Sequence, residues 1–105
     1  MEIYFEDEDL EELIFTGMNR KYKKYSRDRK FMENLIDVYN YIRAAADIKA
    51  LSAYSFLHYE RLRHNDLSSV RIMNNRVERL LFRELENGIC ITIIELNTTH
   101  YGNKK

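Results

Sequence analysis

The sequence contains no proline and no tryptophan, and glycine occurs only at positions 17, 88 and 102. Few positions therefore force a break in the backbone, and we expect these glycines to mark the boundaries of helices and strands. The one cysteine, Cys90, cannot form a disulfide within the chain. This excludes the class of small domains that depend on several disulfides and favours a reducing compartment.

Long hydrophobic runs are also missing. The longest apolar stretch, ICITII at 89–94, is far too short to span a bilayer. Residues 6–12 read EDEDLEE, which is acidic where the start of a signal peptide would be basic. The sequence therefore predicts a cytoplasmic protein with no membrane partner.

The first twelve residues lack positive charge altogether and carry seven acids. The other 93 residues hold all 17 Lys and Arg residues but only ten of the 17 acids, a surplus of seven positive charges. A basic body predicts a polyanionic partner. The alternative, two solvated surfaces of different charge, stays open from charge alone.

Length and composition fit one globular domain over residues 1–105. The chain is 45% hydrophobic and 32% charged, which is typical of a folded domain with a modest core.

Hydrophobic spacing predicts helices in the first half of the chain. IYF at 3–5 is β-prone and predicts a short edge strand. A helix capped by Asp9 is expected to end near Gly17, and a longer one over 28–46, with Ser26 as its cap, carries apolar residues three and four apart. Asp47 can begin a further short helix. The segment 19–30 is a basic loop or the polar entry to the long helix.

The last third changes to the pattern of strands. Residues 69–73, 77–85 and 89–96 are rich in Val, Ile, Leu and Phe, and Asn74-Asn75 and Glu86-Asn87-Gly88 stand between them. These segments predict a three-stranded antiparallel meander. The fold class is therefore α+β, with N-terminal helices packed on a C-terminal β-meander.

The meander carries four arginines, Arg71, Arg76, Arg79 and Arg83. A turn centred on Asn74-Asn75 would place Arg71 opposite Glu78 across the hairpin. The other face would then hold Val70, Val77, Arg79, Leu81 and Arg83. Two interpretations stay open: cross-strand ion pairs with solvated edges, or a basic sheet that holds phosphates, because arginine presents a rigid fork of donors.

Known metal and nucleotide motifs are absent. The sequence has no HExxH or CxxC spacing, no P-loop, no dinucleotide fingerprint and no GxSxG elbow. We therefore expect neither a metal nor a cofactor.

One set of residues, His58, Arg71 and His100, fits metal-independent RNA cleavage. That reaction needs a base for the ribose 2′-hydroxyl, a cation for the phosphate and an acid for the leaving 5′-oxygen. Histidine can fill either proton-transfer role near neutral pH, and arginine suits the phosphate. Tyrosines could stack unpaired bases; the candidates are Tyr22, Tyr25, Tyr59 and Tyr101.

The C-terminal half resembles the RelE/ParE superfamily of toxins, and within it the HigB-type or plasmid-maintenance killer proteins. The segments that carry this resemblance are LHYERLR (57–63), SVRIMNNRVERLLFRELENG (69–88) and IIELNTTHYG (93–102). Thr98-Thr99 stands before His100 where that family often has Asp-Tyr, and Tyr101 follows it.

The resemblance implies a RelE-like toxin fold and a type II toxin that cuts messenger RNA on the ribosome without a metal. It implies that Arg71 stabilises the phosphate and that His100 and His58 are the catalytic histidines. The partners would be the ribosome with its mRNA, and a helix-turn-helix antitoxin. The expected RNA-binding residues are Arg61, Arg63, Arg79, Arg83 and Tyr101.

Two other functions remain open from the sequence. A ParE-like protein that inhibits a topoisomerase would need no histidines. A non-catalytic partner-binding module, derived from such a toxin, is the other alternative.

Overall fold

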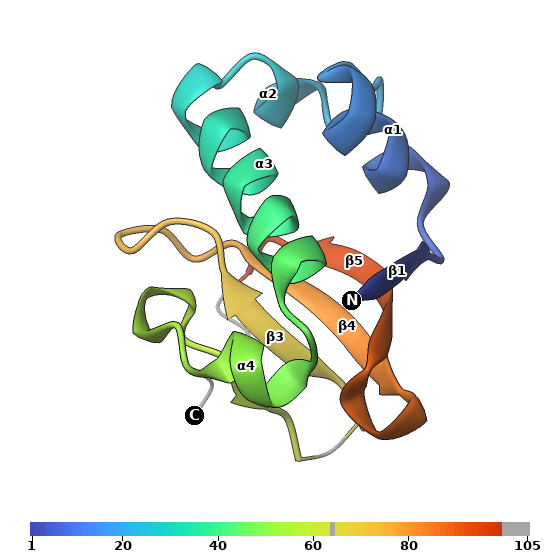
Figure 1. The fold of residues 1–105 in the computed structure, drawn as a ribbon. Helices are drawn as coiled ribbons and strands as arrows, with labels where there is room; N and C mark the ends of the chain where they lie inside the picture. Colours follow the sequence, from blue (N-terminus) through green and yellow to red (C-terminus); the bar gives the residue numbers. More distant parts are fainter. Residues whose placement is uncertain (64, 100–105) are drawn as a thin grey trace.

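A computed structural model of the chain describes residues 1–63 and 65–99, where a group of N-terminal helices covers a sheet built mostly from the second half of the chain (Figure 1). The α-helices are α1 (Glu8–Thr16), α2 (Lys23–Ser26), α3 (Arg29–Ala44) and α4 (Ile48–Ser52), and the 3-10 turns are η1 (Ser55–Leu57) and η2 (Glu86–Gly88). The strands are β1 (Glu2–Phe5), β2 (Glu60–Arg61), β3 (Ser68–Arg71), β4 (Arg79–Leu85) and β5 (Cys90–Asn97). The predicted α+β class is confirmed.

The sheet is mixed, with the strand order β1-β5-β4-β3-β2. Strands β3, β4 and β5 form the predicted antiparallel meander. The predicted edge strand also exists, and β1 pairs with β5 in the parallel direction. The two-residue strand β2 lies at the other edge, in a segment for which the sequence indicated no structure.

Aspartates begin three of the helices. Asp7, Asp28 and Asp47 each accept a hydrogen bond from the backbone N–H three residues later. Such a bond satisfies one of the amide groups that the first turn leaves without a partner. The predicted cap Asp47 is confirmed. The predicted caps Asp9 and Ser26 were wrong, since the true caps lie two residues away, at Asp7 and Asp28. An acceptor directly before the helix is the one that reaches the amides of its first turn.

The main core lies between the helices and one face of the sheet. Phe31 and Leu35 of α3 pack there with Leu80 and Phe82 of β4, all fully buried. Alternate β4 residues point to the opposite face, where Leu81 packs in a second, small cluster with Leu62 and Leu67. Arg79 and Arg83 alternate with the core residues of β4, so they share this second face with Leu81.

The hairpin between β3 and β4 has a different register from the expected one. Arg71 pairs with Arg79 and Val70 with Leu80, so the prediction that Arg71 faces Glu78 was wrong. Val70 lies in the main core and does not share the face of Arg79. The connection from 72 to 78 is longer than a tight turn on Asn74-Asn75, because Glu78 is held by a contact to the helices instead.

Candidate functional site

Two arginines stand directly opposite each other on neighbouring strands. Arg71 at the end of β3 is the register partner of Arg79 at the start of β4. Like charges in this position repel, so the arrangement is destabilising unless an anion or acid compensates it. Within the residues that the structure describes, Arg71 forms no ion pair and donates only a long hydrogen bond, 3.4 Å, to the carbonyl of Asn74. This leaves most of its guanidinium donors available.

Arg79 is held in place by three groups. Its Nε donates to the Ser69 hydroxyl at 2.8 Å and its Nη2 to the His58 carbonyl at 2.7 Å, while Glu60 lies 3.9 Å away. Burial lowers the pKa of Arg79, and the nearby charge of Arg71 lowers it further, whereas Glu60 raises it. Arg79 therefore acts as a fixed, desolvated charge beside the freer Arg71.

The bond from Arg79 also positions the loop that carries His58. His58 ends η1 in the left-handed backbone region, with φ 48° and ψ 51°, and its side chain is exposed. Such a conformation is uncommon for a residue with a side chain and persists where neighbours hold it. The structure thus brings the backbone of His58 next to Arg79, which in turn lies opposite Arg71.

The other arginines predicted to bind RNA lie elsewhere. Arg61 on β2 faces the helix side of the sheet, where it pairs with Asp66 and, at 3.4 Å, with Glu84. Arg83 is four residues along β4 from Arg79, a distance of about 13 Å at the rise of a strand. Arg63 is exposed in the loop after β2. The structure therefore does not gather these three around Arg71.

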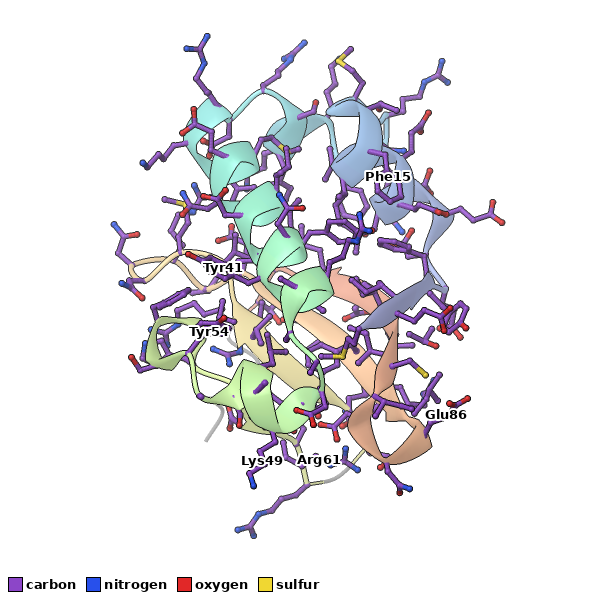
Figure 2. All side chains as sticks on the ribbon, in the orientation of Figure 1. Phe15, Tyr41, Lys49, Tyr54, Arg61 and Glu86 are labelled. Carbon is purple, nitrogen blue, oxygen red and sulfur yellow. The ribbon has the colours of Figure 1, made fainter. Side chains whose placement is uncertain are left out.

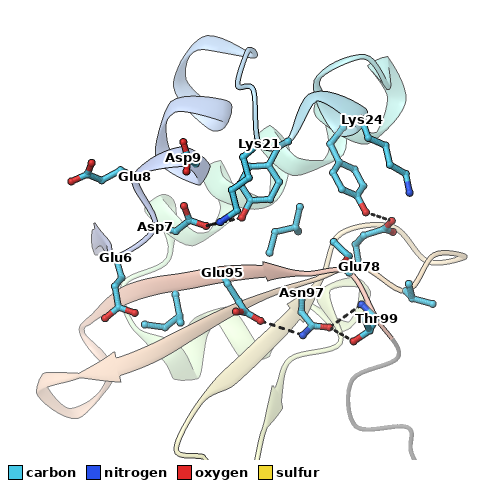
Figure 3. Close-up of a pocket in the computed structure, with 16 residues that line it drawn as sticks. Glu6, Asp7, Glu8, Asp9, Lys21, Lys24, Glu78, Glu95, Asn97 and Thr99 are labelled. Carbon is cyan, nitrogen blue, oxygen red and sulfur yellow. Dashed lines mark hydrogen bonds and ion pairs between the residues drawn. The ribbon is translucent and has the colours of Figure 1, made fainter.

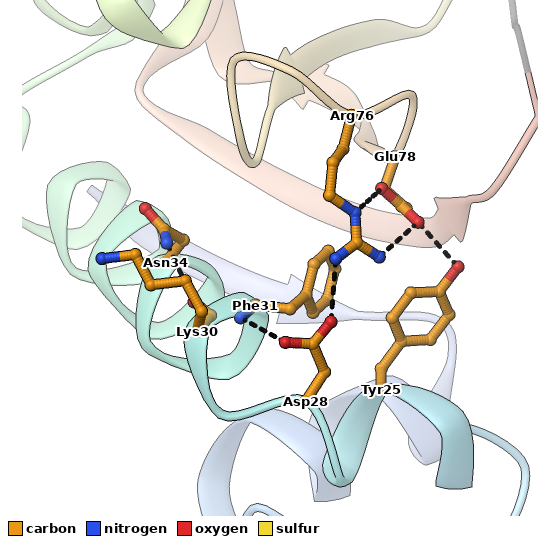
Figure 4. A network of polar contacts seen from close by, with 7 residues as sticks. All are labelled: Tyr25, Asp28, Lys30, Phe31, Asn34, Arg76 and Glu78. Atoms are coloured by element: carbon orange, nitrogen blue, oxygen red, sulfur yellow. Dashed lines mark hydrogen bonds and ion pairs between the residues drawn. The ribbon is translucent and has the colours of Figure 1, made fainter.

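Arg76, by contrast, joins the hairpin to the helices (Figure 4). It pairs with Asp28 at 2.8 Å and with Glu78 at 3.0 Å, and Tyr25 donates to Glu78 at 3.0 Å. The bond from Arg76 holds the pKa of Asp28 below its ordinary value. Burial pushes the pKa of Glu78 up, but the bonds from Arg76 and Tyr25 outweigh it, so that pKa is lowered too. For Arg76 the ion-pair interpretation is the one the structure supports.

Most of the tyrosines that we considered for base stacking are buried or hydrogen-bonded within the protein. Tyr22 and Tyr25 are buried, so their prediction as stacking groups was wrong. Burial and the bond to Glu78 raise the pKa of Tyr25 to about 12. Tyr59 is partly buried and bonds to Glu84 and Ser68.

An open groove of about 1040 Å³ runs beside the C-terminal part of β5 (Figure 3). Its lining is rich in carboxylates: Glu6, Asp7, Glu8, Asp9, Glu78 and Glu95. Thr98 and Thr99 line it as well, and Asn97 accepts hydrogen bonds from the amide and hydroxyl of Thr99. Lys21 and Lys24 line the groove too, but the six carboxylates outnumber these two lysines, so the groove is poorly suited to a phosphate or to RNA.

A second hollow, of about 270 Å³, is lined by Arg71 together with Tyr41 of α3 and Phe56 of η1. Tyr41, Tyr54 and Phe56 pack against one another, with ring centroids 5.0 to 5.6 Å apart. We call these three residues the aromatic trio. All three are exposed by 37% or more. The sequence did not indicate the trio, because its members come from separate elements.

Some predicted groups fall outside the described residues, namely His100 and Tyr101. Within residues 1–63 and 65–99, no three His, Cys, Asp or Glu side chains are arranged to hold a metal ion. No helix in that same part of the chain combines the length and the apolar character needed to cross a membrane.

Comparison of the sequence with protein-family models finds no match, and comparison with curated proteins finds none either. The likeness to RelE/ParE toxins therefore depends on the short motifs and their order alone.

Proposed function

We propose that the chain is a type II toxin with a RelE-like fold, of the HigB type, which cuts messenger RNA on the ribosome without a metal or cofactor. The observation that carries the proposal is the pairing of Arg71 with Arg79 at the ends of two strands, with no acid on Arg71 in the described residues. The helices followed by an antiparallel meander support it as well.

In the proposed reaction, the ribose 2′-oxygen attacks the adjacent phosphorus and the bond from phosphorus to the 5′-oxygen breaks. A base takes the 2′-hydroxyl proton, and an acid gives a proton to the leaving 5′-oxygen. Arg71 stabilises the charge that develops on the phosphate, and the fixed charge of Arg79 strengthens the local positive potential. His58 and His100 fill the two proton-transfer roles.

The partners in this proposal are the ribosome with its mRNA, and a helix-turn-helix antitoxin that covers the basic face. The compartment is the cytoplasm. The proposal assigns these contacts to one domain over residues 1–105.

Growth arrest after expression from a tightly controlled promoter tests the proposal. We expect the parent to arrest growth, and Arg71→Gln and His58→Asn to relieve it. Asparagine removes the imidazole but tolerates the left-handed backbone of position 58. Arg43→Gln is the matched control and should arrest growth like the parent, because Arg43 is exposed on α3 and forms no ion pair within residues 1–63 and 65–99.

Two results would contradict the proposal. Equal arrest by the parent and both site variants would exclude this site. Inhibition of purified gyrase by the parent, together with intact transcripts, would instead support the ParE-like function.

A further inference from the structure

The aromatic trio is unusual because large apolar rings are normally covered. Phe56 is 46% exposed and Tyr41 40% exposed, and their rings are in contact. Figure 2 shows Tyr41 and Tyr54 on the same side of the molecule. A cluster of exposed rings next to a hollow marks a contact site for another molecule. The chemistry of the hollow decides which molecule fits.

The three rings form a packed cluster and not a cage. Rings whose centroids lie 5.0 to 5.6 Å apart are already in contact, so no cation can enter between them. Tyr41 and Phe56 are the two more exposed rings, and their planes meet at 62°, so a flat ligand can stack on one of them and meet the edge of the other. A flat ligand that stacks on one exposed ring fits best, and the bases of single-stranded nucleic acid are such ligands.

Charge fixes how such a ligand lies. Arg71 lines the hollow and has no acidic partner in the described residues, and Arg79 is its cross-strand neighbour. Asp37 of α3 also lines the hollow, one turn before Tyr41 on the same helix face. Its carboxylate repels a phosphate, so the phosphate of the ligand is expected on Arg71.

We propose that the aromatic trio and Arg71 form a subsite for one unpaired RNA nucleotide, with the base stacked on one exposed ring of the Tyr41–Phe56 pair and a phosphate on Arg71. The subsite rests on the proposed endonuclease function for the identity of its ligand, and it deepens that function. It holds the strand next to the phosphate at Arg71, so it sets which nucleotide neighbours the cut.

Fluorescence anisotropy with a labelled, unstructured eight-nucleotide RNA tests the subsite on the full chain. Tyr41→Leu/Phe56→Leu keeps the apolar packing but removes two stacking faces, and we expect Kd to rise at least about tenfold. Phe15→Leu is the matched control: Phe15 is 57% exposed on α1, well apart from the trio in Figure 2, and should change Kd less than about twofold.

Arg71→Gln tests the phosphate end. We expect the slope of log K against log salt concentration to fall by about 0.7, the value for one phosphate contact on a single strand. An unchanged slope, or an unchanged Kd in a folded Tyr41→Leu/Phe56→Leu variant, would overturn the subsite.

Photocrosslinking of the unmodified protein to an RNA that carries 5-iodouridine avoids any folding defect of the variants. Crosslinks on Tyr41, Tyr54 or Phe56 support the subsite, and crosslinks confined to other residues overturn it. If the parent cleaves transcripts and the double variant binds RNA as tightly as the parent, the subsite alone is overturned. RNA binding through the trio without any cleavage would overturn the endonuclease function alone.

Discussion

Arg79 connects the sheet to the loop before β2, because its guanidinium donates to the carbonyl oxygen of His58 at 2.7 Å. The same guanidinium satisfies the fully buried hydroxyl of Ser69. One side chain therefore fixes both the loop of the candidate histidine and the strand that carries Arg71.

This relationship predicts strong coupling between Arg79 and Ser69. Arg79→Met removes the donors and leaves the Ser69 hydroxyl buried and unpaired, at a cost of roughly 1–2 kcal/mol in unfolding free energy. Adding Ser69→Ala removes the orphaned hydroxyl, so the double variant should recover at least about 0.5 kcal/mol relative to additivity. Urea unfolding of the parent, both single variants and the double variant measures this.

Arg83→Met provides the control, because Arg83 lies on the same strand face and forms no ion pair in the described residues. Its effect should be within about 0.5 kcal/mol and additive with Ser69→Ala. Additive behaviour of Arg79→Met with Ser69→Ala would show that the bond does not hold this part of the sheet.

The network of Arg76, Asp28 and Glu78 predicts a specific pH dependence. Both carboxyls have lowered pKa values in the folded protein, so their contribution to stability is present above their unfolded values, about 3.9 and 4.3. It is lost as the pH falls through the folded values. Arg76→Gln should therefore destabilise the protein most near pH 6, by roughly 1–3 kcal/mol, and progressively less below about pH 4.

Urea unfolding of the parent and Arg76→Gln between pH 3 and pH 7 measures this difference. Arg43→Gln is again the control and should give a small, pH-independent difference. If the difference in unfolding free energy between the parent and Arg76→Gln stays constant down to pH 3, the network is not its source.

Two glycines have similar backbone conformations, but we expect alanine at these positions to lower the unfolding free energy by different amounts. Gly17 and Gly88 both have positive φ, 78° and 87°. A Cβ at Gly17 meets nothing within 4 Å, whereas a Cβ at Gly88 lies 3.3 Å from the Cβ of Ile48. Gly17→Ala should cost about 1–2 kcal/mol for the backbone alone, and Gly88→Ala at least about 0.5 kcal/mol more.

Thermal and urea unfolding of both glycine variants give the comparison. Equal destabilisation would mean that α4, which carries Ile48, shifts freely away from η2.

The elements that follow a clear hydrophobic period were predictable from the sequence. The spacing of Phe31, Leu35 and Val38 predicted α3, and the runs around Leu81 and Ile93 predicted the meander. The register of the β3–β4 hairpin was not predictable. Asn74-Asn75 suits a tight turn, but the contact of Arg76 and Glu78 with Asp28 and Tyr25 competes with it, and that contact depends on where α2 and α3 pack.

The candidate site was predictable only in part. The order of the motifs made Arg71 and His58 candidates. The role of Arg79 as an anchor could be recognised only from the structure, which brings its guanidinium to Ser69. The aromatic trio had no sequence signal, since Tyr41 lies on the polar side of α3 and Phe56 follows it fifteen residues later. Only the tertiary fold brings the rings together.

Primer-extension mapping of transcripts after induction is the most direct test of the proposed endonuclease function. A reporter transcript with an intact start codon is compared with the same transcript carrying a mutated start codon, in cells that express the parent or Arg71→Gln. The endonuclease function predicts cuts in register with codons on the translated transcript, and none without translation or with Arg71→Gln. Absence of cuts with the parent, or identical cuts on both transcripts, would contradict it.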